Sequence, residues 1–217
     1  MSKRALVGLI LVLLIAGGLA WIYHNRPGTS FDLTPYNALG MGAARETAKL
    51  LGGNGGITII IPEANANNPS LQGELEAFQK TIKKNGIASV KTVKFRLATP
   101  LEVIQTGGML PREQLFSVLQ SAARPGVVVL FCGFPFLPPQ DCETVKQSGT
   151  KIIVVSAYQP NFWNLLKAHV IDLAIVPKSG NSAETAKKAR TLQDGFESEF
   201  AVLTPENIEA FSNSMAN

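Results

Sequence analysis

The sequence contains few of the residues from which catalytic and metal sites are usually built. Its 217 residues include two cysteines and two histidines. Cys132, Cys142, His24 and His169 do not have the spacing of a zinc site. No G-x-S-x-G motif is present, and His169 falls late in an apolar helical pattern, where a core or surface histidine is the usual outcome. We therefore expect no metal, no cofactor and no enzymatic activity.

Charge of one sign is also scarce. The formal net charge of +4 comes from 20 basic and 16 acidic residues, and Lys3 and Arg4 supply two of the positive charges. The remainder is nearly balanced, so it lacks the concentrated basic face that phosphate neutralisation needs. We expect no nucleic-acid partner.

The two cysteines leave two interpretations open. Cys132 follows a predicted strand and Cys142 lies near the start of the next predicted helix. A disulfide between them is geometrically feasible if the domain is exported to an oxidising compartment. Two reduced, partly buried thiols fit the same pattern.

A long apolar segment near the N-terminus predicts contact with a membrane. Residues 5–23 carry no charge and as a helix would extend ~28 Å, close to the thickness of a bilayer core. Trp21 and Tyr23 are placed for the interfacial region, and Lys3 and Arg4 favour a cytoplasmic N-terminus. We expect an inner-membrane anchor with the rest of the chain on the periplasmic, extracytoplasmic side.

A cleaved secretory signal is the alternative. The small-x-small sequence at residues 18–20 is an acceptable cleavage site after the apolar run 5–16. Cleavage would release the domain into the periplasm or medium. On either interpretation we divide the chain into an anchor or signal peptide (1–24), a polar linker (25–34) and one folded lobe (35–217).

The folded part predicts an α/β protein with a doubly wound, mostly parallel sheet. Continuous apolar runs are typical of parallel strands that are covered on both faces. They occupy 57–61, 127–131, 152–155 and 173–176. The run 89–97 alternates apolar and charged residues, which favours an edge strand and the order 2-1-3-4-5. Residues 200–203 predict an extra edge strand, followed by a helix opened by Thr204 and Pro205.

Helix signals separate these strands. Asn68 and Pro69 are placed to cap and begin a helix that ends before Gly86. The glycines within 52–56 precede a strand, so they predict a helix end and a turn and not a phosphate loop.

Polar residues follow the first predicted strand in the stretch "ITIIIPEANANNPSLQG". Open α/β sheets bind ligands at the carboxyl ends of their strands, which makes Glu63, Asn65, Asn67 and Asn68 candidate ligand contacts. Asparagine is also common in turns and caps, and Asn68 already has a capping role. Phe134 and Tyr158, which follow later strands, complete the candidate set.

Two apolar stretches are candidates for a protein interface. "GFPFLPPQ" follows the strand ending at Phe131, and we expect its residues Phe134–Pro139 to form a stiff apolar loop. Phe162 and Trp163 fall in the next predicted loop and would extend the same patch. Packing on the sheet is the alternative role.

The order of segments resembles the C-terminal lobe of the type 1 periplasmic binding proteins. The resemblance rests on "GMGAARETAKLLGGNGGITIIIPEANANNPSLQGELEAFQKTIKKNG", "GTKIIVVSAYQPNFWNLLKAHVIDLAIVPKSG" and "EFAVLTPENI". It implies a lobe that clasps a polar solute against a second lobe, and we expect only one lobe here. Gln72 or Glu74 stands where the family typically has a sugar-gripping arginine.

The other polar residues with which the family typically binds its ligand are also replaced. Cys132–Pro135 stands where the family often has Asn-Asp, and Ser156–Tyr158 where it often has aspartate. The sequence therefore favours a non-enzymatic sensory, accessory or protein-interaction module. A binding protein for a sugar-like or polar solute in a transport system is the alternative.

Overall fold

The structure is a computed structural model that describes most of the folded lobe. The described residues are 15, 31–53, 55–87, 89–97, 99–106, 109–155, 162–178 and 190–215. Internal contacts divide the chain into Met1–Asp32 and Leu33–Asn217, and the second unit, called the lobe below, is described by itself. The predicted anchor lies outside the described residues except for Ile15. Within the described part of the chain, no helix is long and apolar enough to cross a membrane.

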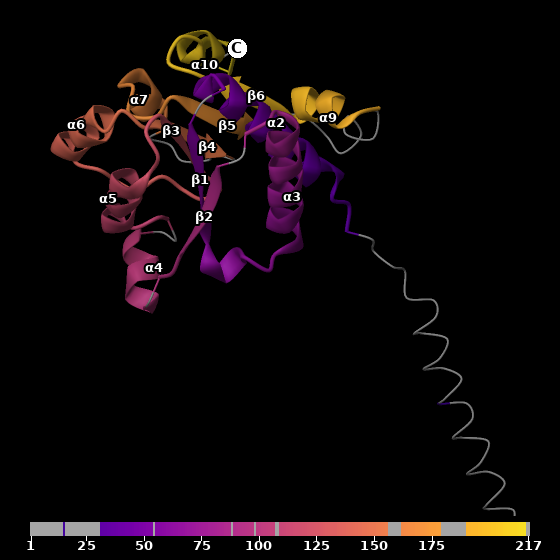
Figure 1. The fold of residues 1–217 in the computed structure, drawn as a ribbon, viewed down its shortest axis with the longest axis horizontal. Helices are drawn as coiled ribbons and strands as arrows, with labels where there is room; N and C mark the ends of the chain where they lie inside the picture. Colours follow the sequence, from indigo (N-terminus) through magenta and orange to yellow (C-terminus); the bar gives the residue numbers. More distant parts are fainter. Residues whose placement is uncertain are drawn as a thin grey trace, which may run out of the picture. The chain divides into compact units, whose positions relative to one another are not determined.

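A six-stranded sheet forms the centre of the lobe (Figure 1). The strands are β1 (Gly56–Pro62), β2 (Val90–Phe95), β3 (Gly126–Leu130), β4 (Lys151–Val155), β5 (Leu173–Pro177) and β6 (Phe200–Leu203). Their order is β2-β1-β3-β4-β5-β6, and β6 alone pairs antiparallel with its neighbour. The predicted order and the extra edge strand are both confirmed.

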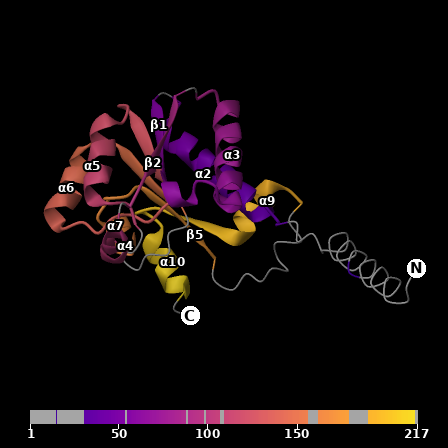
Figure 2. The same cartoon turned by 90° about the horizontal axis from the view of Figure 1, so that it is seen from below.

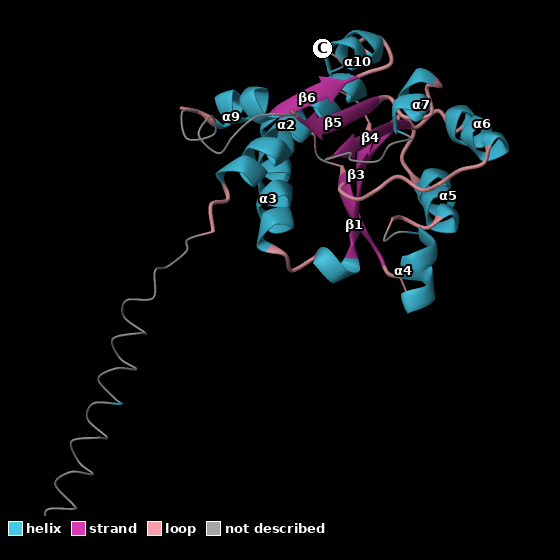
Figure 3. Ribbon diagram, turned by 180° about the vertical axis from the view of Figure 1, so that it is seen from behind, coloured by secondary structure: helices cyan, strands magenta, loops and turns pink. Residues whose placement is uncertain are grey.

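Helices cover both faces of the sheet, which the magenta strands of Figure 3 and the view in Figure 2 make visible. They are α2 (Thr34–Leu51), η1 (Glu63–Asn65), α3 (Pro69–Lys84), α4 (Pro100–Thr106), α5 (Arg112–Ser121), α6 (Pro139–Gln147), α7 (Phe162–Lys167), α9 (Leu192–Glu199) and α10 (Ile208–Met215). Residues of α2, α3 and α9 share one hydrophobic cluster, and those of α5, α6, α7 and α10 share the other.

Alternating residues of each central strand enter these two clusters. In β1, Ile59 packs toward α2 and α3, whereas Ile60 packs toward the opposite layer. In β3, Val129 and Val128 divide in the same way, and all four side chains are fully buried. Burial on both faces explains why these strands appear in the sequence as unbroken apolar runs.

The predicted helix boundaries around β1 are confirmed. The backbone N–H of Gly52 donates to the Ala48 carbonyl at 3.2 Å, and the φ of +66° at Gly52 is left-handed, which glycine adopts without strain. The side chain of Asn68 accepts from the Ser70 N–H at 2.9 Å, and Pro69 begins α3. These two turns place the end of β1 at one edge of the sheet.

Two predicted boundaries are wrong. Phe162 and Trp163 were expected in a loop, but they are the first residues of α7. The last helix was expected from Pro205, but it begins at Ile208. The side chain of Asn207 accepts from the Thr204 N–H at 2.8 Å and donates to the Val202 carbonyl at 2.9 Å, so it holds residues 204–207 as a turn.

Candidate functional site

The carboxyl ends of β1 and β2 lie side by side. Pro62 and Phe95 are partners at the end of their parallel register. The η1 turn begins at Glu63, directly after β1. After β2, the N–H of Thr99 donates to the Glu102 carboxylate at 3.2 Å and the N–H of Glu102 donates back to the Thr99 hydroxyl at 3.1 Å, which caps α4. Two polar turns therefore border one hollow.

This hollow is a cavity of about 600 Å³. It is lined by Pro62, Glu63, Ala64, Asn65, Phe95, Arg96, Leu97 and Val103. Its size falls within the range of small-molecule sites. The lining combines apolar side chains with one carboxylate, one amide and one guanidinium, so it suits a small ligand with both polar and apolar parts.

The two charged side chains of this cavity, Arg96 and Glu63, interact only weakly with each other. The Nε of Arg96 lies 3.9 Å from Oε2 of Glu63, and the two side chains are 81% and 54% exposed. That distance is longer than a hydrogen bond, and exposed ion pairs add little to stability. Both groups therefore retain free capacity to bind a ligand.

Four large apolar side chains are exposed beside the cavity. Leu101, Val103 and Ile104 of α4 are 61%, 46% and 78% exposed, and Phe136 before α6 is 73% exposed. Val103 also lines the cavity. A second hollow of about 190 Å³ is lined by Thr106 at the end of α4 and by Phe136, so the end of α4 lies near the loop that carries Phe136. These four residues are called the α4–Phe136 surface below.

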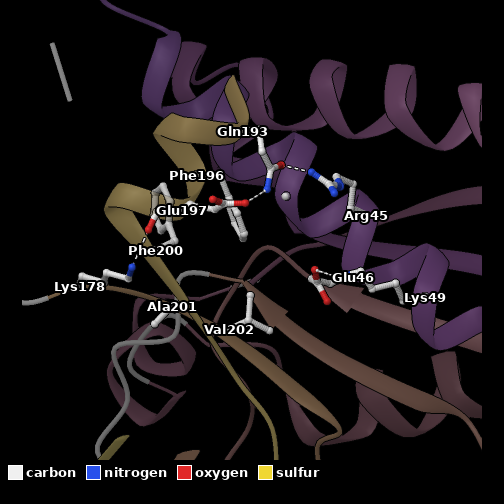
Figure 4. Close-up of a pocket in the computed structure, with 11 residues that line it drawn as sticks. Arg45, Glu46, Lys49, Lys178, Gln193, Phe196, Glu197, Phe200, Ala201 and Val202 are labelled. Atoms are coloured by element: carbon white, nitrogen blue, oxygen red, sulfur yellow. Dashed lines mark hydrogen bonds and ion pairs between the residues drawn. The ribbon is translucent and has the colours of Figure 1, made fainter. Parts of the chain in front are cut away.

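A further cavity of about 370 Å³ lies between α2, α9 and β6 (Figure 4). Arg45 donates to the side-chain oxygen of Gln193, whose amide donates to the Glu197 carboxylate. The ammonium of Lys49 lies 2.6 Å from Glu46. Lys178, the remaining charged side chain of the lining, donates to the Glu197 carbonyl at 2.5 Å. All of these charges have partners within the chain, so this cavity marks the contact of α9 with α2.

No protein-family model and no curated protein matches the chain by sequence. Solved structures match its fold. A LacI transcriptional regulator from Bacteroides fragilis matches with a TM-score of 0.52 at 12% identity, over 81% of this chain and 61% of its own. The arabinose-binding protein AraP from Geobacillus stearothermophilus matches with a TM-score of 0.52 at 15% identity, over 81% and 63%.

A XylFII–LytSN complex matches with a TM-score of 0.50 at 17% identity, over 79% of this chain and 60% of its own. The lobe has the type 1 periplasmic binding protein fold. This chain spans 60–63% of the length of these three structures. Identities of 12–17% show the fold, and a shared fold does not assign a ligand.

The structure separates the predicted ligand contacts into three groups. Glu63 and Asn65 line the cavity at the edge where this fold opens its crevice, whereas Asn67 and Asn68 are exposed outside its lining. Phe134 is fully buried in the core, where its ring presents no surface to a ligand. Tyr158 lies outside the described residues.

The sequence interpretation missed Arg96, Leu97 and Val103 as lining residues. The signal for them was present, because the predicted order 2-1 places the end of the second strand against the end of the first. Arg96 and Leu97 follow β2 directly. The segment after β2 contains α4, whose exposed apolar residues do not follow the pattern of a buried helix face.

The remaining candidates are the two cysteines and the pair Phe162 and Trp163. Cys132 and Cys142 are both free, and burial raises the pKa of each thiol above its ordinary value. Trp163 stacks on Phe162 at 4.8 Å and on Phe211 of α10 at 5.9 Å, so α10 covers part of the patch that was expected to face a partner. Among the residues that the structure describes, no three metal-ligating side chains form a group.

Proposed function

We propose that this protein is a membrane-anchored, extracytoplasmic module of the periplasmic-binding-protein fold that acts by binding another protein and not by catalysis. The observation that carries the proposal is the α4–Phe136 surface. Large apolar side chains that are exposed in one region of a protein are typical of protein–protein contact sites. The surface also lies at the carboxyl edge of the sheet, where proteins of this fold place their functional crevice.

The surroundings of the surface suit a protein contact. Protein interfaces have an apolar centre and a polar rim that remains partly solvated. Here the rim includes the exposed side chains of Arg96 and Glu113. One of the similar structures is a complex of XylFII with LytSN. A chain of similar fold is therefore found in a complex with another protein.

The proposed location comes from the sequence. The apolar run 5–23 is long enough to span a bilayer, and Lys3 and Arg4 favour an N-terminus on the cytoplasmic side. We expect the full chain to stay with membranes after carbonate washing, and the lobe to be degraded when protease is added to spheroplasts. Recovery of the lobe in the cytosol, protected from that protease, would contradict the location.

The lining of the cavity supports a binding role over a catalytic one. Among the lining residues, Glu63, Asn65 and Arg96 are the polar side chains, and they include no nucleophile paired with a base. A carboxylate, an amide and a guanidinium can hold a polar ligand in place. They do not by themselves form a hydrolytic or group-transfer site.

Position-specific photocrosslinking in intact cells tests the protein contact. A benzoylphenylalanine placed at Ile104 should give covalent protein adducts, and the same probe at Leu192 should not. Leu192 is a suitable control because it is a large apolar residue, 37% exposed, on α9. Equal adduct formation at both positions, or none at Ile104, would remove the support for a protein-binding role.

A second function is favoured by the cavity itself. Its volume and its polar groups Glu63, Asn65 and Arg96 fit a sugar-like or other small polar solute. A thermal-shift screen of the full chain against sugars and nucleosides tests this alternative. A hit should be lost in Asn65→Ala and Arg96→Gln and kept in Lys80→Gln, whose exposed side chain lies on α3. A flat screen would favour the protein-binding role.

A further inference from the structure

We infer that one face of the lobe lies on the bilayer and binds anionic lipid headgroups through Lys80, Lys83 and Lys84 of α3 and Lys94 of β2. These four residues are called the α3–β2 lysine face below. The inference rests on the proposed location, because it needs the lobe to be held at a membrane. It goes beyond the proposed protein contact by assigning a second surface with a different partner.

The basic residues of the chain are unevenly distributed. Residues 77–101 contain six lysines and arginines and no aspartate or glutamate, whereas the rest of the chain has 14 basic and 16 acidic residues. This segment includes the last turns of α3 and all of β2. The near balance of the whole chain therefore conceals one basic segment, which is where a negatively charged surface would be attracted.

The lysines of this face have no partners among the described residues. Elsewhere in the described part of the chain, each lysine interacts with an acidic residue: Lys49 with Glu46, Lys146 with Glu143, Lys151 with Asp172, Lys167 with Glu209 and Lys178 with the Glu197 carbonyl. The four lysines of the α3–β2 lysine face are exposed and form no such pair with any described residue. Their charges are therefore available to a partner.

Few carboxylates offset these charges. Glu76 is exposed on α3 one turn before Lys80, so four cations face one exposed carboxylate. At the carboxyl end of β2, Arg96 and Glu63 add one charge of each sign. Lys91 is also exposed on β2, but its side chain points to the opposite face of the sheet. The face thus has an excess of three positive charges.

The register of the sheet places Lys94 on the same side as α3. Lys94 is the partner of Ile61 in the parallel pairing of β2 with β1. Ile61 packs in the hydrophobic cluster that β1 shares with α3, and paired residues of neighbouring strands point to the same face. Lys80, Lys83 and Lys84 are three and four residues apart, so they lie on one side of α3. The two elements therefore present their lysines on one side of the lobe.

The composition of this face suits lipid headgroups better than a protein. A protein interface has an apolar centre, but no large apolar side chain is exposed on α3 or β2, both of which the structure describes in full. Lysine carries its charge on a flexible stem, which suits a layer of mobile phosphate groups. The proposed extracytoplasmic location keeps the face apart from nucleic acid.

The start of the lobe lies beside α3, within reach of the proposed anchor. A Cβ atom built at Gly73 would lie 3.4 Å from Leu33 and 3.7 Å from Tyr36, so the chain enters the lobe next to the first turns of α3. Nine residues separate Leu33 from Tyr23, the end of the proposed anchor, and they span at most about 35 Å. Lys83 is about 15 Å further along α3 from Gly73. A short tether therefore holds this side of the lobe close to the bilayer.

Lipid contact at α3 is compatible with the proposed protein contact. α5 and α6 lie on the other side of the sheet from α3 (Figure 1). The loop that carries Phe136 leads into α6, and α4 ends near this loop. A lobe that lies on its α3 side would leave this loop open to a partner.

Lipid-headgroup quenching of the full chain in vesicles tests the inference. A fluorophore attached through azidophenylalanine at Gln79, exposed next to Lys80, is compared with the same label at Gln140, exposed on α6. In vesicles with about 30% phosphatidylglycerol and a nitroxide on the headgroups, quenching should be at least about twofold stronger at position 79. Pure phosphatidylcholine, or about 0.5 M salt, should remove the difference because the attraction is electrostatic.

Two triple variants provide the matched comparison. The first carries Lys80→Gln, Lys83→Gln and Lys84→Gln, and the second carries Lys49→Gln, Lys146→Gln and Lys167→Gln. Both remove three positive charges at exposed positions. The first should lower quenching at position 79 to its value in phosphatidylcholine, and the second should leave it unchanged. Thermal unfolding of each variant checks that the lobe remains folded.

Equal quenching at positions 79 and 140 in the phosphatidylglycerol vesicles would overturn the inference, as would quenching at 79 that survives the first triple variant. Equal quenching together with capture of an acidic protein by benzoylphenylalanine at position 79 in cells would assign the face to a protein instead. Flotation with pure phosphatidylcholine vesicles reports the anchor by itself, and adducts at Ile104 report the protein contact. Loss of either result with quenching at 79 retained would refute that part of the proposed function and leave the lipid contact in place.

Discussion

The guanidinium of Arg112, the first residue of α5, donates two hydrogen bonds to the carboxylate of Asp141 in α6. One joins Nη2 to Oδ1 at 2.9 Å, and the other joins Nε to Oδ2. Asp141 is buried, and Arg112 also lies over the ring of Phe116, 5.4 Å from its centroid. Hydrogen bonding to Arg112 lowers the pKa of Asp141. This pair holds α6 against α5, next to the loop that carries Phe136.

We expect Asp141→Asn and Arg112→Lys each to lower the melting temperature by about 3–10 °C at pH 7. The asparagine removes the charge, and the lysine cannot donate two parallel hydrogen bonds. Because the folded-state pKa of Asp141 is lowered, the pair stabilises the protein above the ordinary aspartate pKa, and this stabilisation is lost as the pH falls through the folded-state value. The effect of Asp141→Asn should therefore disappear at acidic pH.

Thermal unfolding followed by circular dichroism measures both changes. Glu143→Gln is the control on the same helix, because its ion pair with Lys146 is solvent-exposed. It should shift the melting temperature by less than about 2 °C. An equal shift for Glu143→Gln and Asp141→Asn would show that burial and geometry give the Arg112–Asp141 pair no special contribution.

The contact between α2 and α3 depends on Gly40. A Cβ atom added there would lie 2.0 Å from the backbone carbonyl oxygen of Glu74, which cannot move without shifting α3. Gly40→Ala should therefore destabilise the lobe by about 3 kcal/mol or more, or prevent folding. An exposed helical glycine would show the opposite sign, because alanine has the higher helix propensity.

Gly73→Ala provides the matched control for this prediction. A Cβ atom at Gly73 would meet Asn37 Oδ1 at 3.1 Å, which is the end of a side chain and not backbone, so a shift of a few tenths of an ångström relieves the contact. Urea unfolding should place Gly73→Ala within about 1 kcal/mol of the wild-type protein. A stability for Gly40→Ala equal to or above that of the wild type would show that the two helices can separate at no cost.

The layer order of this fold could be predicted because it depends on burial alone. Unbroken apolar runs such as Val127–Phe131 identify strands that are covered on both faces. The alternating charges of β2 identify an edge. Local capping chemistry at Asn68 and Gly52 then fixes two helix ends. Each of these signals can be recognised in a few consecutive residues, without knowing which other elements they contact.

The content of the site could be predicted only in part, because it depends on which loops meet. Glu63 was found because it directly follows a strand, but its neighbour Arg96 comes from the end of a different strand. Phe134 and Phe136 look alike in sequence, yet one is fully buried and the other is 73% exposed. Packing against helices that are distant in the chain decides such differences, and no local pattern reports it.

Trp163 offers a spectroscopic test of how the last helix is held. Its indole lies between the rings of Phe162 and Phe211, and Lys167 forms a 3.4 Å ion pair with Glu209 at the same contact of α7 with α10. With Trp21 replaced by phenylalanine, so that Trp163 is the remaining tryptophan, Phe211→Ala should shift the tryptophan emission to longer wavelength and destabilise the lobe by about 1–2 kcal/mol. Phe136→Ala, which removes an exposed ring, should change neither quantity. Unchanged emission in Phe211→Ala would mean that α10 does not shield Trp163.

Glu74 predicts how the stability of the lobe depends on pH. Burial on α3, where this helix crosses α2, raises the pKa of its carboxyl from 4.5 to about 7. The folded protein therefore holds a proton that the unfolded chain releases, so stability should fall by up to about 3 kcal/mol as the pH rises from 4.5 to 7, and then level off. Glu74→Gln mimics the protonated form and should be more stable than the wild type at pH 8 and similar to it at pH 4.5.

Urea unfolding of the full chain at pH 4.5, 6 and 8 measures this dependence. Glu76→Gln is the control, because Glu76 is exposed on the same helix, and it should keep the wild-type pH profile. Since the free energy of unfolding is linked to the protons bound in each state, only the removal of a group with a shifted pKa can flatten the profile. Parallel profiles for the wild type and Glu74→Gln would show that the carboxyl of Glu74 is hydrated in the folded protein. In that case α2 would pack less closely over α3 than the close approach of Gly40 to Glu74 indicates.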